Sequence, residues 1–247
     1  MLDIVVPVYN EGKGILRLFQ EIEQEIKTPK RVMIVYDFEE DTTVPVVKAH
    51  QNDYSFRIEL LLNTIGRGAL NAIKTGMQVA KNEMVLVMMA DSSDKLDVVD
   101  QMCAMMDQGY DLVCGSRYMK GGKQNGGPLL KGLFSRMAGL SLHVLTRIPT
   151  HDCSNSFKLY RRSMLEQIKI ESTGGFEIGL EILVKAYVAG FKIGEVPSEW
   201  FDREEGKSNF HMWKWMPSYL HWYWYCVKST WRKTNCLEIK DKGRTIQ

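Results

Sequence analysis

The stretch MVLVMMADSSD spans Met84–Asp94, and its apolar run ends in two aspartates and two serines. A run of this length before polar turn residues is typical of a strand buried on both faces of a parallel sheet. Ligands of open α/β sheets bind at the carboxyl ends of such strands. Asp91 and Asp94 therefore lie where a site is expected, although Ser93 or Asp94 would also suit the N-cap of a helix predicted over 96–106.

The same stretch has the chemistry of a site for a hard divalent cation. Mg²⁺ and Mn²⁺ favour carboxylate, hydroxyl and phosphate oxygens over sulfur and nitrogen. Two carboxylates with serines between them offer such oxygens. The stretch therefore indicates Mg²⁺ or Mn²⁺ as a cofactor that bridges to a phosphate-bearing substrate.

Outward from this stretch, apolar runs of strand length alternate with segments of helical periodicity. Strands are predicted over 2–8, 31–36, 57–62, 111–115, 158–160 and 191–197, and helices over 14–26, 43–50, 69–79, 129–145 and 177–189. This alternation predicts an α/β fold, a Rossmann-like and mostly parallel sheet flanked by helices. We expect one such domain over 1–210.

The composition changes near residue 211, and five of the six tryptophans lie between 211 and 231 with basic residues around them. This predicts a C-terminal aromatic and amphipathic helical segment over 211–247, with a charged, disordered tail after Lys233. Trp and Tyr suit a membrane interface, but they also dominate cores and dimer interfaces, so both interpretations stay open.

Composition excludes several classes of protein. A net charge of +2 gives no support for a nucleic-acid partner. The five cysteines are scattered without CxxC spacing, which fits a reducing compartment rather than a disulfide framework or zinc site. No window approaches the roughly 18 uncharged apolar residues of a membrane span.

Two further features suit phosphate, and each has a plainer explanation. The turn Gly66-Arg67-Gly68 precedes a helix, where backbone amides can approach an anion, but it could equally be a simple tight turn. Arg117 could grip phosphate with its planar fork or form an ordinary surface ion pair. Lys131 and Ser135 are four residues apart and share a helix face.

Seven motifs in a fixed order resemble inverting family-2 glycosyltransferases of the GT-A fold, and among them the dolichyl- or polyprenyl-phosphate sugar synthases. The resemblance covers residues 4–210. The motifs are VVPVYNEG from Val5, YDFEEDTT from Tyr36, NTIGRGALNAIKTG from Asn63, MAD from Met89, GSRYMKGG from Gly115, DCSNSFKLYRR from Asp152 and EVPSEWFDREEGKSN from Glu195.

The resemblance implies a role for each matching residue. It implies a donor-nucleotide site formed by Pro7, Tyr9, Glu11, Asp37, Gly66, Arg67, Asp91 and Arg203. It implies a metal site at Asp91 and Ser93, and an acceptor-phosphate site at Arg117, Lys131 and Ser135. The residues expected to carry catalysis are Asp91, Arg117 and Arg203.

The chain also departs from the family pattern. Met89 occupies the place of the first metal-motif aspartate, and Tyr36, Phe38 and Glu39 replace an acid and a Gly-Ser pair. Asn155-Ser156 replaces Ser-Gly, and Asn209 stands where lysine is common. Because a thioether is a poor ligand for a hard cation, we expect weaker metal binding or a different donor.

Three functions follow as hypotheses. The first is inverting transfer of a sugar from a GDP- or UDP-linked donor to a polyprenyl phosphate. The second is transfer to a glycan or soluble hydroxyl, which needs a carboxylate base such as Asp152 or Glu181. The third is a degenerate nucleotide-binding domain without turnover. The first implies a membrane surface as partner, a homodimer or membrane-anchor subunit as further options, and a peripheral place on the cytoplasmic face of a membrane.

Overall fold

A computed structural model of the chain describes residues 1–202 and 212–244, with side chains described over 1–202 and 215–232. Its centre is a seven-stranded sheet in the order β3-β2-β1-β4-β7-β5-β8. All neighbouring strands are parallel except β7, which is antiparallel to both β4 and β5. The strands are β1 (Leu2–Pro7), β2 (Lys30–Tyr36), β3 (Arg57–Leu62), β4 (Met84–Val87), β5 (Leu112–Ser116), β7 (Lys158–Arg161) and β8 (Ile193–Pro197).

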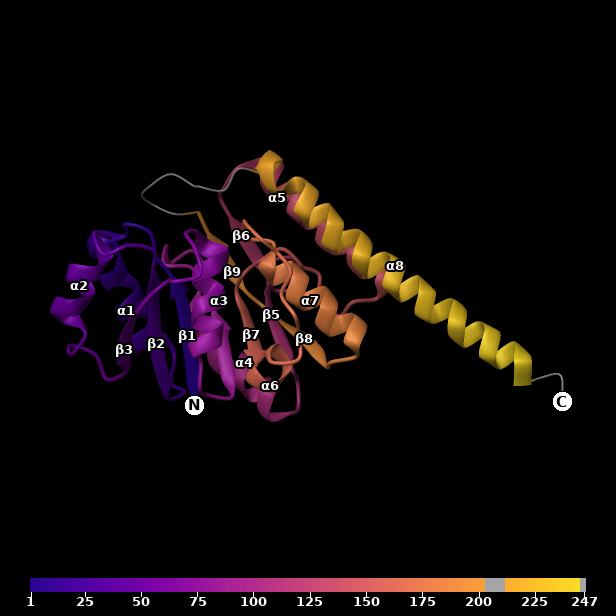
Figure 1. The fold of residues 1–247 in the computed structure, drawn as a ribbon, viewed down its shortest axis with the longest axis horizontal. Helices are drawn as coiled ribbons and strands as arrows, with labels where there is room; N and C mark the ends of the chain where they lie inside the picture. The colour runs from indigo at the N-terminus through magenta and orange to yellow at the C-terminus, as the bar shows by residue number, and fades with distance from the viewer. Residues whose placement is uncertain (203–211, 245–247) are drawn as a thin grey trace.

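Helices cover both faces of this sheet, which confirms the predicted α/β architecture (Figure 1). On one face lie α1 (Ile15–Glu25), α2 (Thr43–His50) and α4 (Val99–Asp107). On the other lie α3 (Ala69–Val79), α5 (Leu129–Thr146), α6 (Arg162–Leu165), α7 (Ile178–Ala189) and α8 (Met212–Arg244). Short 3₁₀ turns, η1 (Gly12–Gly14) and η2 (Leu96–Val98), lead into α1 and α4.

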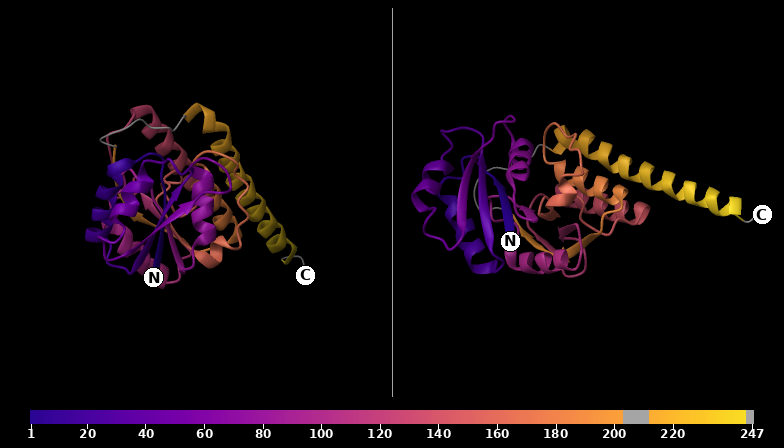
Figure 2. Two further views of the ribbon diagram at one scale, coloured as in Figure 1. Left: turned by 60° about the vertical axis from the view of Figure 1, so that its left-hand side comes forward. Right: turned by 60° about the horizontal axis from the view of Figure 1, so that its bottom comes forward.

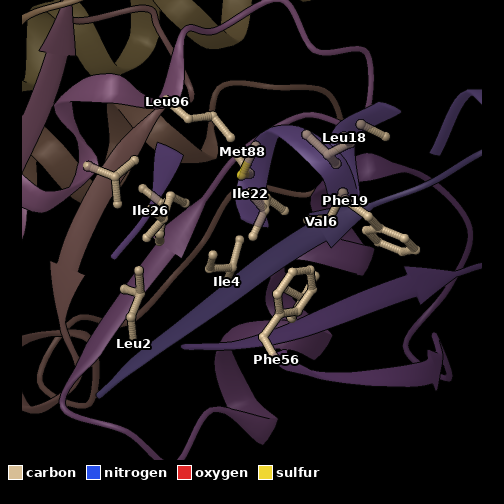
Figure 3. Close-up of a cluster of buried hydrophobic side chains, with 14 of the residues drawn as sticks. Leu2, Ile4, Val6, Leu18, Phe19, Ile22, Ile26, Phe56, Met88 and Leu96 are labelled. Atoms are coloured by element: carbon tan, nitrogen blue, oxygen red, sulfur yellow. The ribbon is translucent and has the colours of Figure 1, made fainter. Parts of the chain in front are cut away.

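Successive residues of the central strands feed two separate cores. In β1, Leu2, Ile4 and Val6 pack under α1 (Figure 3), whereas Val5 packs under α3. Side chains alternate across a strand, so a strand covered on both sides needs apolar residues at every position. This explains the uninterrupted apolar run before Asp91.

The strand order reverses between β1 and β4. The chain builds outward from β1 through β2 to β3, and then returns to add β4 on the other side of β1. Such a reversal separates the loops that follow the two strands and leaves room for a ligand between them. The loops after Pro7 and Val87 flank this point, so the expected site lies at the switch point of the sheet.

A small second sheet, which the sequence pattern does not predict, lies beside the first. It pairs β6 (Lys123–Asn125) with β9 (Glu199–Phe201) in parallel. Both strands are only three residues long, so they carry no periodicity that a sequence pattern can reveal. The pairing holds the segment after β8 against the loop after β5.

The C-terminal segment forms one long helix, α8, which packs against α5 and α7 before it projects beyond the sheet (Figures 1 and 2). Trp222 is buried and donates from Nε1 to Ser172 Oγ over 3.1 Å. Trp224 and Trp231 remain about half exposed. The helix continues to Arg244, so the prediction of a disordered tail after Lys233 is wrong for the described residues.

A buried ion-pair cluster closes the opposite, amino-terminal edge of the sheet. Asp3 is fully buried and accepts hydrogen bonds from Arg31 Nε at 2.8 Å and Nη2 at 2.7 Å. It also accepts from the backbone amides of Lys81 and Asn82. Burial opposes ionisation of Asp3, but these hydrogen bonds together outweigh it and lower the pKa of its carboxyl.

We expect Asp3→Asn to lower the free energy of unfolding by about 3 kcal/mol at neutral pH, because Arg31 loses its buried partner. Since the folded pKa of Asp3 lies below the unfolded value near 4, its contribution is present above that pH and is lost as the pH falls. The difference between wild type and variant in urea unfolding should therefore shrink between pH 5 and pH 2, as a rough range.

The matched control is Asp53→Asn, which removes an exposed ion pair with His50. This change should alter unfolding by less than about 1 kcal/mol. An Asp3→Asn deficit that stays constant from neutral pH into acid would contradict the assignment of a lowered pKa to Asp3.

The cysteines whose side chains are described, Cys103, Cys114, Cys153 and Cys226, are buried and free. Within the described part of the chain, no helix combines the length and the apolar character needed to cross a membrane.

Candidate functional site

Polar loops gather along the carboxyl edge of the sheet. The loops after β1, β2, β3, β4 and β5 all lie there because these strands are parallel. The start of β7 joins them, since its Lys158 pairs with Val87 at the end of β4. The edge is the upper one in Figure 1. Except for Pro7, the last residue of β1, and Arg203, every residue expected to bind donor, metal or acceptor lies in one of these loops or on α5.

Asp37 ties the loop after β2 to the loop after β3. Its Oδ1 accepts from Asn63 Nδ2 at 2.7 Å, and its Oδ2 accepts from the Gly68 amide at 2.7 Å. Asn63 Oδ1 in turn accepts from Thr75 on α3. The Gly68 amide is therefore already engaged, and the Gly66–Gly68 turn is held by Asp37 rather than open along its whole length.

Three side chains from three loops contact one another beside this turn. The Tyr9 and Phe38 rings meet edge to face with centroids 5.7 Å apart. The Arg67 guanidinium lies over the Phe38 ring at 5.4 Å. Tyr9 is more than half exposed, and Arg67 is exposed. Such an aromatic pair can stack on a nucleobase, and the adjacent guanidinium can contact a phosphate.

The loop after β1 is fixed to the start of α2. The Asn10 amide donates to Asp41 Oδ2, and the Glu11 amide donates to Thr43 Oγ1, each over 3.0 Å. Asp41 is fully buried. Pro7 is also buried at the end of β1, whereas Glu11 is half-buried. Of the two, Glu11 can therefore face a ligand, and Pro7 shapes the loop.

The loop after β4 turns sharply. Ser92 adopts a left-handed backbone with φ of 51°, which is uncommon for a residue other than glycine. The Ser93 amide donates to Asp91 Oδ1 over 3.2 Å, and the Ser93 carbonyl accepts from Phe201 on β9. Lys95, not Ser93 or Asp94, precedes η2, and no side chain caps it, so the predicted N-cap is wrong.

Asp91 and its neighbours supply oxygens that fit a hard cation. Ser92 Oγ and Ser93 Oγ are buried without a hydrogen-bond partner among the described residues. Buried hydroxyls normally have partners, so these two are open to a ligand. One carboxylate suffices where substrate phosphates complete the coordination of Mg²⁺. Among the described residues, no group of three or more His, Cys, Asp or Glu is placed to hold a metal ion.

Met89 is partly buried and packs against the core cluster that contains Val87 and the inner residues of α3 and α7. The chain thus has an apolar contact where the resembled family has its first metal-motif carboxylate. The departure therefore removes one carboxylate from the predicted metal site.

Asp94 is a buried carboxyl between the two halves of the site, and the resemblance gives it no role. Its Oδ1 accepts from Asn155 Nδ2 over 3.2 Å, and the same amide reaches the Gly115 carbonyl. Burial raises the pKa of Asp94 to about 7, although Asn155 and the charge of Arg117 act in the opposite direction. Its place three residues after Asp91 is the only sequence signal for it.

Arg117 is held from behind by Asp152. Its Nε donates to Asp152 Oδ2 at 2.6 Å, and its Nη2 donates to Asp152 Oδ1 at 3.0 Å. Nη2 also reaches Ser135 Oγ and Ser154 Oγ. Nη1 has no hydrogen-bond partner among the described residues. The guanidinium is thus oriented on one side and has donors left for an anion on the other.

Asp152 is fully buried, yet it stays ionised. Burial opposes its charge, but the charge and hydrogen bonds of Arg117 outweigh burial and lower its pKa. The same contact raises the pKa of Arg117, so the pair remains charged. The alternative of an ordinary surface ion pair for Arg117 is wrong, because the Arg117 side chain is only 12% exposed.

Ser135 completes this group from helix α5. Its Oγ accepts from Arg117 Nη2 at 3.1 Å and from Tyr118 OH at 2.9 Å, and it lies 2.6 Å from Ser154 Oγ. Lys131 lies one turn earlier on the same helix, as its spacing predicts. The structure therefore brings together Arg117 and Ser135, with Lys131 on the same helix.

Neither carboxylate predicted as a base is available for proton transfer. Asp152 is paired with Arg117. Glu181 is fully buried on α7, accepts from the amides of Glu171 and Ser172, and pairs with Lys185 at 2.7 Å. Both carboxylates are engaged in buried ion pairs, so neither of these two residues is placed to serve a hydroxyl acceptor as its base.

Arg203 lies outside the described residues, and the chain is described up to Asp202. The Asp202 amide donates to the Asn125 carbonyl, and the Asp94 backbone bridges to Trp200 on β9. The chain is therefore next to the loop after β4 just before Arg203.

The fold and these residues define a ligand-binding protein of the open α/β class, with its site at the switch point of the sheet. The chain belongs to the family described as glycosyl transferase family 2, which it matches over residues 3–169.

Two relatives match most of the chain. It is 27% identical over 210 residues to the dolichol-phosphate mannosyltransferase of Pyrococcus furiosus, covering 84% of this chain and 58% of that one. It is 25% identical to the polyprenol monophosphomannose synthase of Mycolicibacterium smegmatis, covering 83% of this chain and 79% of that one. The chain thus spans little more than half the length of the first relative.

Solved structures share the fold at low sequence identity. Glucosyl-3-phosphoglycerate synthase from Mycobacterium tuberculosis, in complex with UDP, gives a TM-score of 0.65 at 13% identity, covering 92% of this chain and 80% of that one. S. aureus TarS 1–349, in complex with UDP-GlcNAc, gives 0.56 at 20% identity, covering 83% of this chain and 59% of that one. The predicted GT-A fold is confirmed.

Proposed function

We propose that this protein moves a sugar from a GDP- or UDP-linked donor to a polyprenyl phosphate, with inversion at the anomeric carbon. The family match and the names of both relatives support this function. We assign transfer to residues 1–210, and treat 211–247 as a separate C-terminal segment. The acceptor implies a peripheral place on the cytoplasmic face of a membrane, with a homodimer or a membrane-anchor subunit as further partners.

The observation that carries the proposal is the Arg117 cluster. A buried arginine, oriented by Asp152 and flanked by Ser135 and Ser154, offers donors and no base. Such a cluster suits an acceptor that is already ionised at neutral pH, as a phosphate is. A hydroxyl acceptor would need a carboxylate to remove its proton, and the two predicted ones are engaged elsewhere.

The donor would lie across the switch point. Tyr9, Phe38 and Arg67 would contact the nucleotide, while Asp37 holds the turn beneath it. Asp91 and Ser93 would hold Mg²⁺ or Mn²⁺, and a related solved structure contains Mn²⁺ together with UDP. When bound, such a cation stabilises the negative charge that develops on a leaving diphosphate.

The residues of this chain would act by positioning. Arg117, Lys131 and Ser135 would orient the acceptor phosphate so that one of its oxygens attacks the anomeric carbon opposite the leaving nucleotide. The bond from that carbon to the donor diphosphate breaks as the new bond forms, which inverts the configuration. Arg203 would offset charge on the leaving group from the segment after β9.

A donor screen tests the proposal. Protein would be mixed with UDP- and GDP-sugars, Mg²⁺ or Mn²⁺ and a short-chain polyprenyl phosphate, and nucleotide release would be measured. We expect release with one donor class that requires both the metal and the phosphate. Equal release with a polyprenol that lacks phosphate would overturn the proposed acceptor, and nucleotide binding without release under every condition would favour a degenerate domain.

A further inference from the structure

Asp94 belongs to the loop after β4, but its side chain is bonded to the loop before β7. The carboxyl is buried, and its Oδ1 accepts from Asn155 Nδ2 over 3.2 Å. The two residues are 61 positions apart in the chain, and the resemblance to the family assigns a role to neither. This contact is a buried tertiary link between two loops of the site, so its neighbours on each side decide what it can do.

On one side of the link lies the group that would hold the acceptor phosphate. The Asn155 backbone amide donates to Asp152 Oδ1 over 3.2 Å, and Asp152 accepts from Arg117 Nε at 2.6 Å. Asn155 Nδ2 also donates to the Gly115 carbonyl at 3.2 Å, and Asn155 Oδ1 accepts from the Phe157 amide at 3.3 Å. Asn155 is bonded at its backbone and at both ends of its side-chain amide, so its orientation and that of Asp152 are set together.

On the other side of the link lies the position predicted for the metal. Asp94 follows Asp91 by three residues, and the Asp94 backbone bridges to Trp200 on β9. The residues directly before and after Asp94 are hydrogen-bonded to the same strand over 2.8 and 3.0 Å. Strand β9 therefore holds the backbone of Asp94 in place, and its carboxyl reaches Asn155 from a fixed position.

The link depends on asparagine at position 155, where the resembled family has serine. A side-chain amide has two protons to donate, and Asn155 Nδ2 donates to both Asp94 Oδ1 and the Gly115 carbonyl. A serine hydroxyl has one proton and cannot bond to both acceptors. The bridge between the two loops is therefore a feature of this chain, and it accounts for one of its departures from the family pattern.

We propose that Asp94 is a positioning residue that acts through Asn155 and sets the distance between the metal-bound donor and the acceptor phosphate. This inference rests on the proposed function. Transfer requires the attacking oxygen close to the anomeric carbon and in line with the leaving group, and a displacement of about 1 Å can lower the rate about 10²-fold. Because the two linked loops would hold opposite substrates, loss of the link slows transfer and leaves the binding of each substrate intact.

This role needs a hydrogen-bond acceptor at position 94 and not a charge. An asparagine there keeps an oxygen in the place of Oδ1, so Asn155 keeps both of its acceptors. An alanine there leaves Asn155 Nδ2 with the Gly115 carbonyl alone. The two substitutions therefore separate positioning from proton transfer or charge stabilisation by Asp94, because those roles would be lost in both variants.

Steady-state kinetics of the full chain test the proposal, with the donor found in the screen, Mn²⁺ and polyprenyl phosphate. Asp94→Ala should lower kcat at least about tenfold and leave the KM of both substrates within about twofold of wild type. Asp94→Asn should keep kcat within about threefold of wild type. Asn155→Ser should lower kcat as Asp94→Ala does, and the double variant should be no slower than the slower single variant, since both changes remove the same contact.

The matched control is Asn82→Ala at the amino-terminal edge of the sheet. Asn82 Nδ2 donates to Oδ1 of the buried Asp3 over 2.6 Å, which is the same kind of contact away from the site. This variant should lose thermal stability and keep kcat. Wild-type kcat in Asp94→Ala would overturn the proposal, and so would a loss in Asp94→Asn as large as that in Asp94→Ala. An equal loss of kcat in Asn82→Ala would also overturn it, since kcat would then follow stability alone.

Hydrogen exchange separates failure of this inference from failure of the proposed function. The Asn155 amide donates to Asp152, and the Phe157 amide donates to Asn155 Oδ1, so both should exchange faster in Asp94→Ala than in wild type or Asn82→Ala. That result, with no transfer by wild type to any acceptor, would uphold the link and overturn the proposed function. Wild-type transfer, with unchanged exchange and unchanged kcat in Asp94→Ala, would overturn the link alone.

Discussion

Replacing Asp91 with alanine is expected to lower sugar transfer by roughly 10³-fold, which corresponds to about 4 kcal/mol of transition-state stabilisation. Asp91 is the carboxylate predicted to bind the metal in the loop after β4, and Met89, which packs against the core, stands where the resembled family has a second one. Because Mg²⁺ and Mn²⁺ are commonly held by one or two carboxylates and substrate phosphates, loss of one carboxylate removes much of the protein's share of the coordination. Initial rates with saturating donor and Mn²⁺ would measure the loss.

The control for this change is Asp97→Ala. Asp97 lies six residues after Asp91, and its exposed carboxylate pairs with Lys95. Its rate should stay within about twofold of wild type, as exposed ion pairs contribute little. Titration calorimetry in the presence of nucleotide should detect Mn²⁺ binding to Asp97→Ala and no Mn²⁺ binding to Asp91→Ala. An unchanged rate in Asp91→Ala would remove Asp91 from the site.

Replacing Arg117 with lysine is expected to lower kcat/KM for the acceptor by about 10²-fold while leaving the KM for the donor unchanged. Lysine keeps the charge beside Asp152, so the buried carboxylate keeps a partner and the protein stays folded. Lysine lacks the planar guanidinium. In Arg117, Nε and Nη2 of this group donate to Asp152, while Nη1 can donate to an anion. Acceptor and donor saturation curves would separate these effects.

Arg136→Lys is the matched control, because Arg136 is exposed on α5 and belongs to neither group of site residues. It should leave both KM values near those of wild type. A rise in the donor KM for Arg117→Lys, with the acceptor KM unchanged, would move Arg117 to the donor side and contradict the assignment. Loss of thermal stability without either change would give Arg117 a structural role only.

The sequence predicts the central elements well because their residues carry strong and regular signals. The strand around Val85 is apolar at every position and the strand around Val5 at every position but Asp3, and such runs have few interpretations in a chain that alternates with helices. Helices α2 and α3 begin and end at the predicted residues. The antiparallel strand β7 could not be oriented from sequence, since direction depends on the path of the chain before it.

The site was predictable in its location but not in its internal contacts. Asp37, Asp91 and Arg117 each follow a predicted parallel strand, so the sequence places all three at the carboxyl edge of the sheet. The partners that orient them, such as Asn63 for Asp37 and Asp152 for Arg117, lie 26 and 35 residues away. Such long-range hydrogen bonds leave no periodic signal. The structure also gives Asp152 a positioning role where the sequence suggested a base.

The exposed surface of α5 and α8 shows the same limit of sequence patterns. Tryptophans gather between 211 and 231, and that enrichment indicates an interface without saying which residues face outward. The apolar residues of α5 look like an ordinary core stripe until the structure shows that the stripe is exposed. Burial of Trp222 and exposure of Leu130 follow from how α5 and α8 pack together, which only tertiary structure determines.

The most direct measurement of the central claim is mass spectrometry of the lipid product. The protein would be incubated with the donor selected by the screen, Mn²⁺ and an equimolar mixture of polyprenyl phosphate and the corresponding polyprenol. We predict one new species, with the mass of the polyprenyl phosphate plus one sugar residue, and no glycosylated polyprenol. A glycosylated polyprenol, or consumption of the donor without any lipid product, would contradict the assignment of Arg117 and Ser135 to an acceptor phosphate.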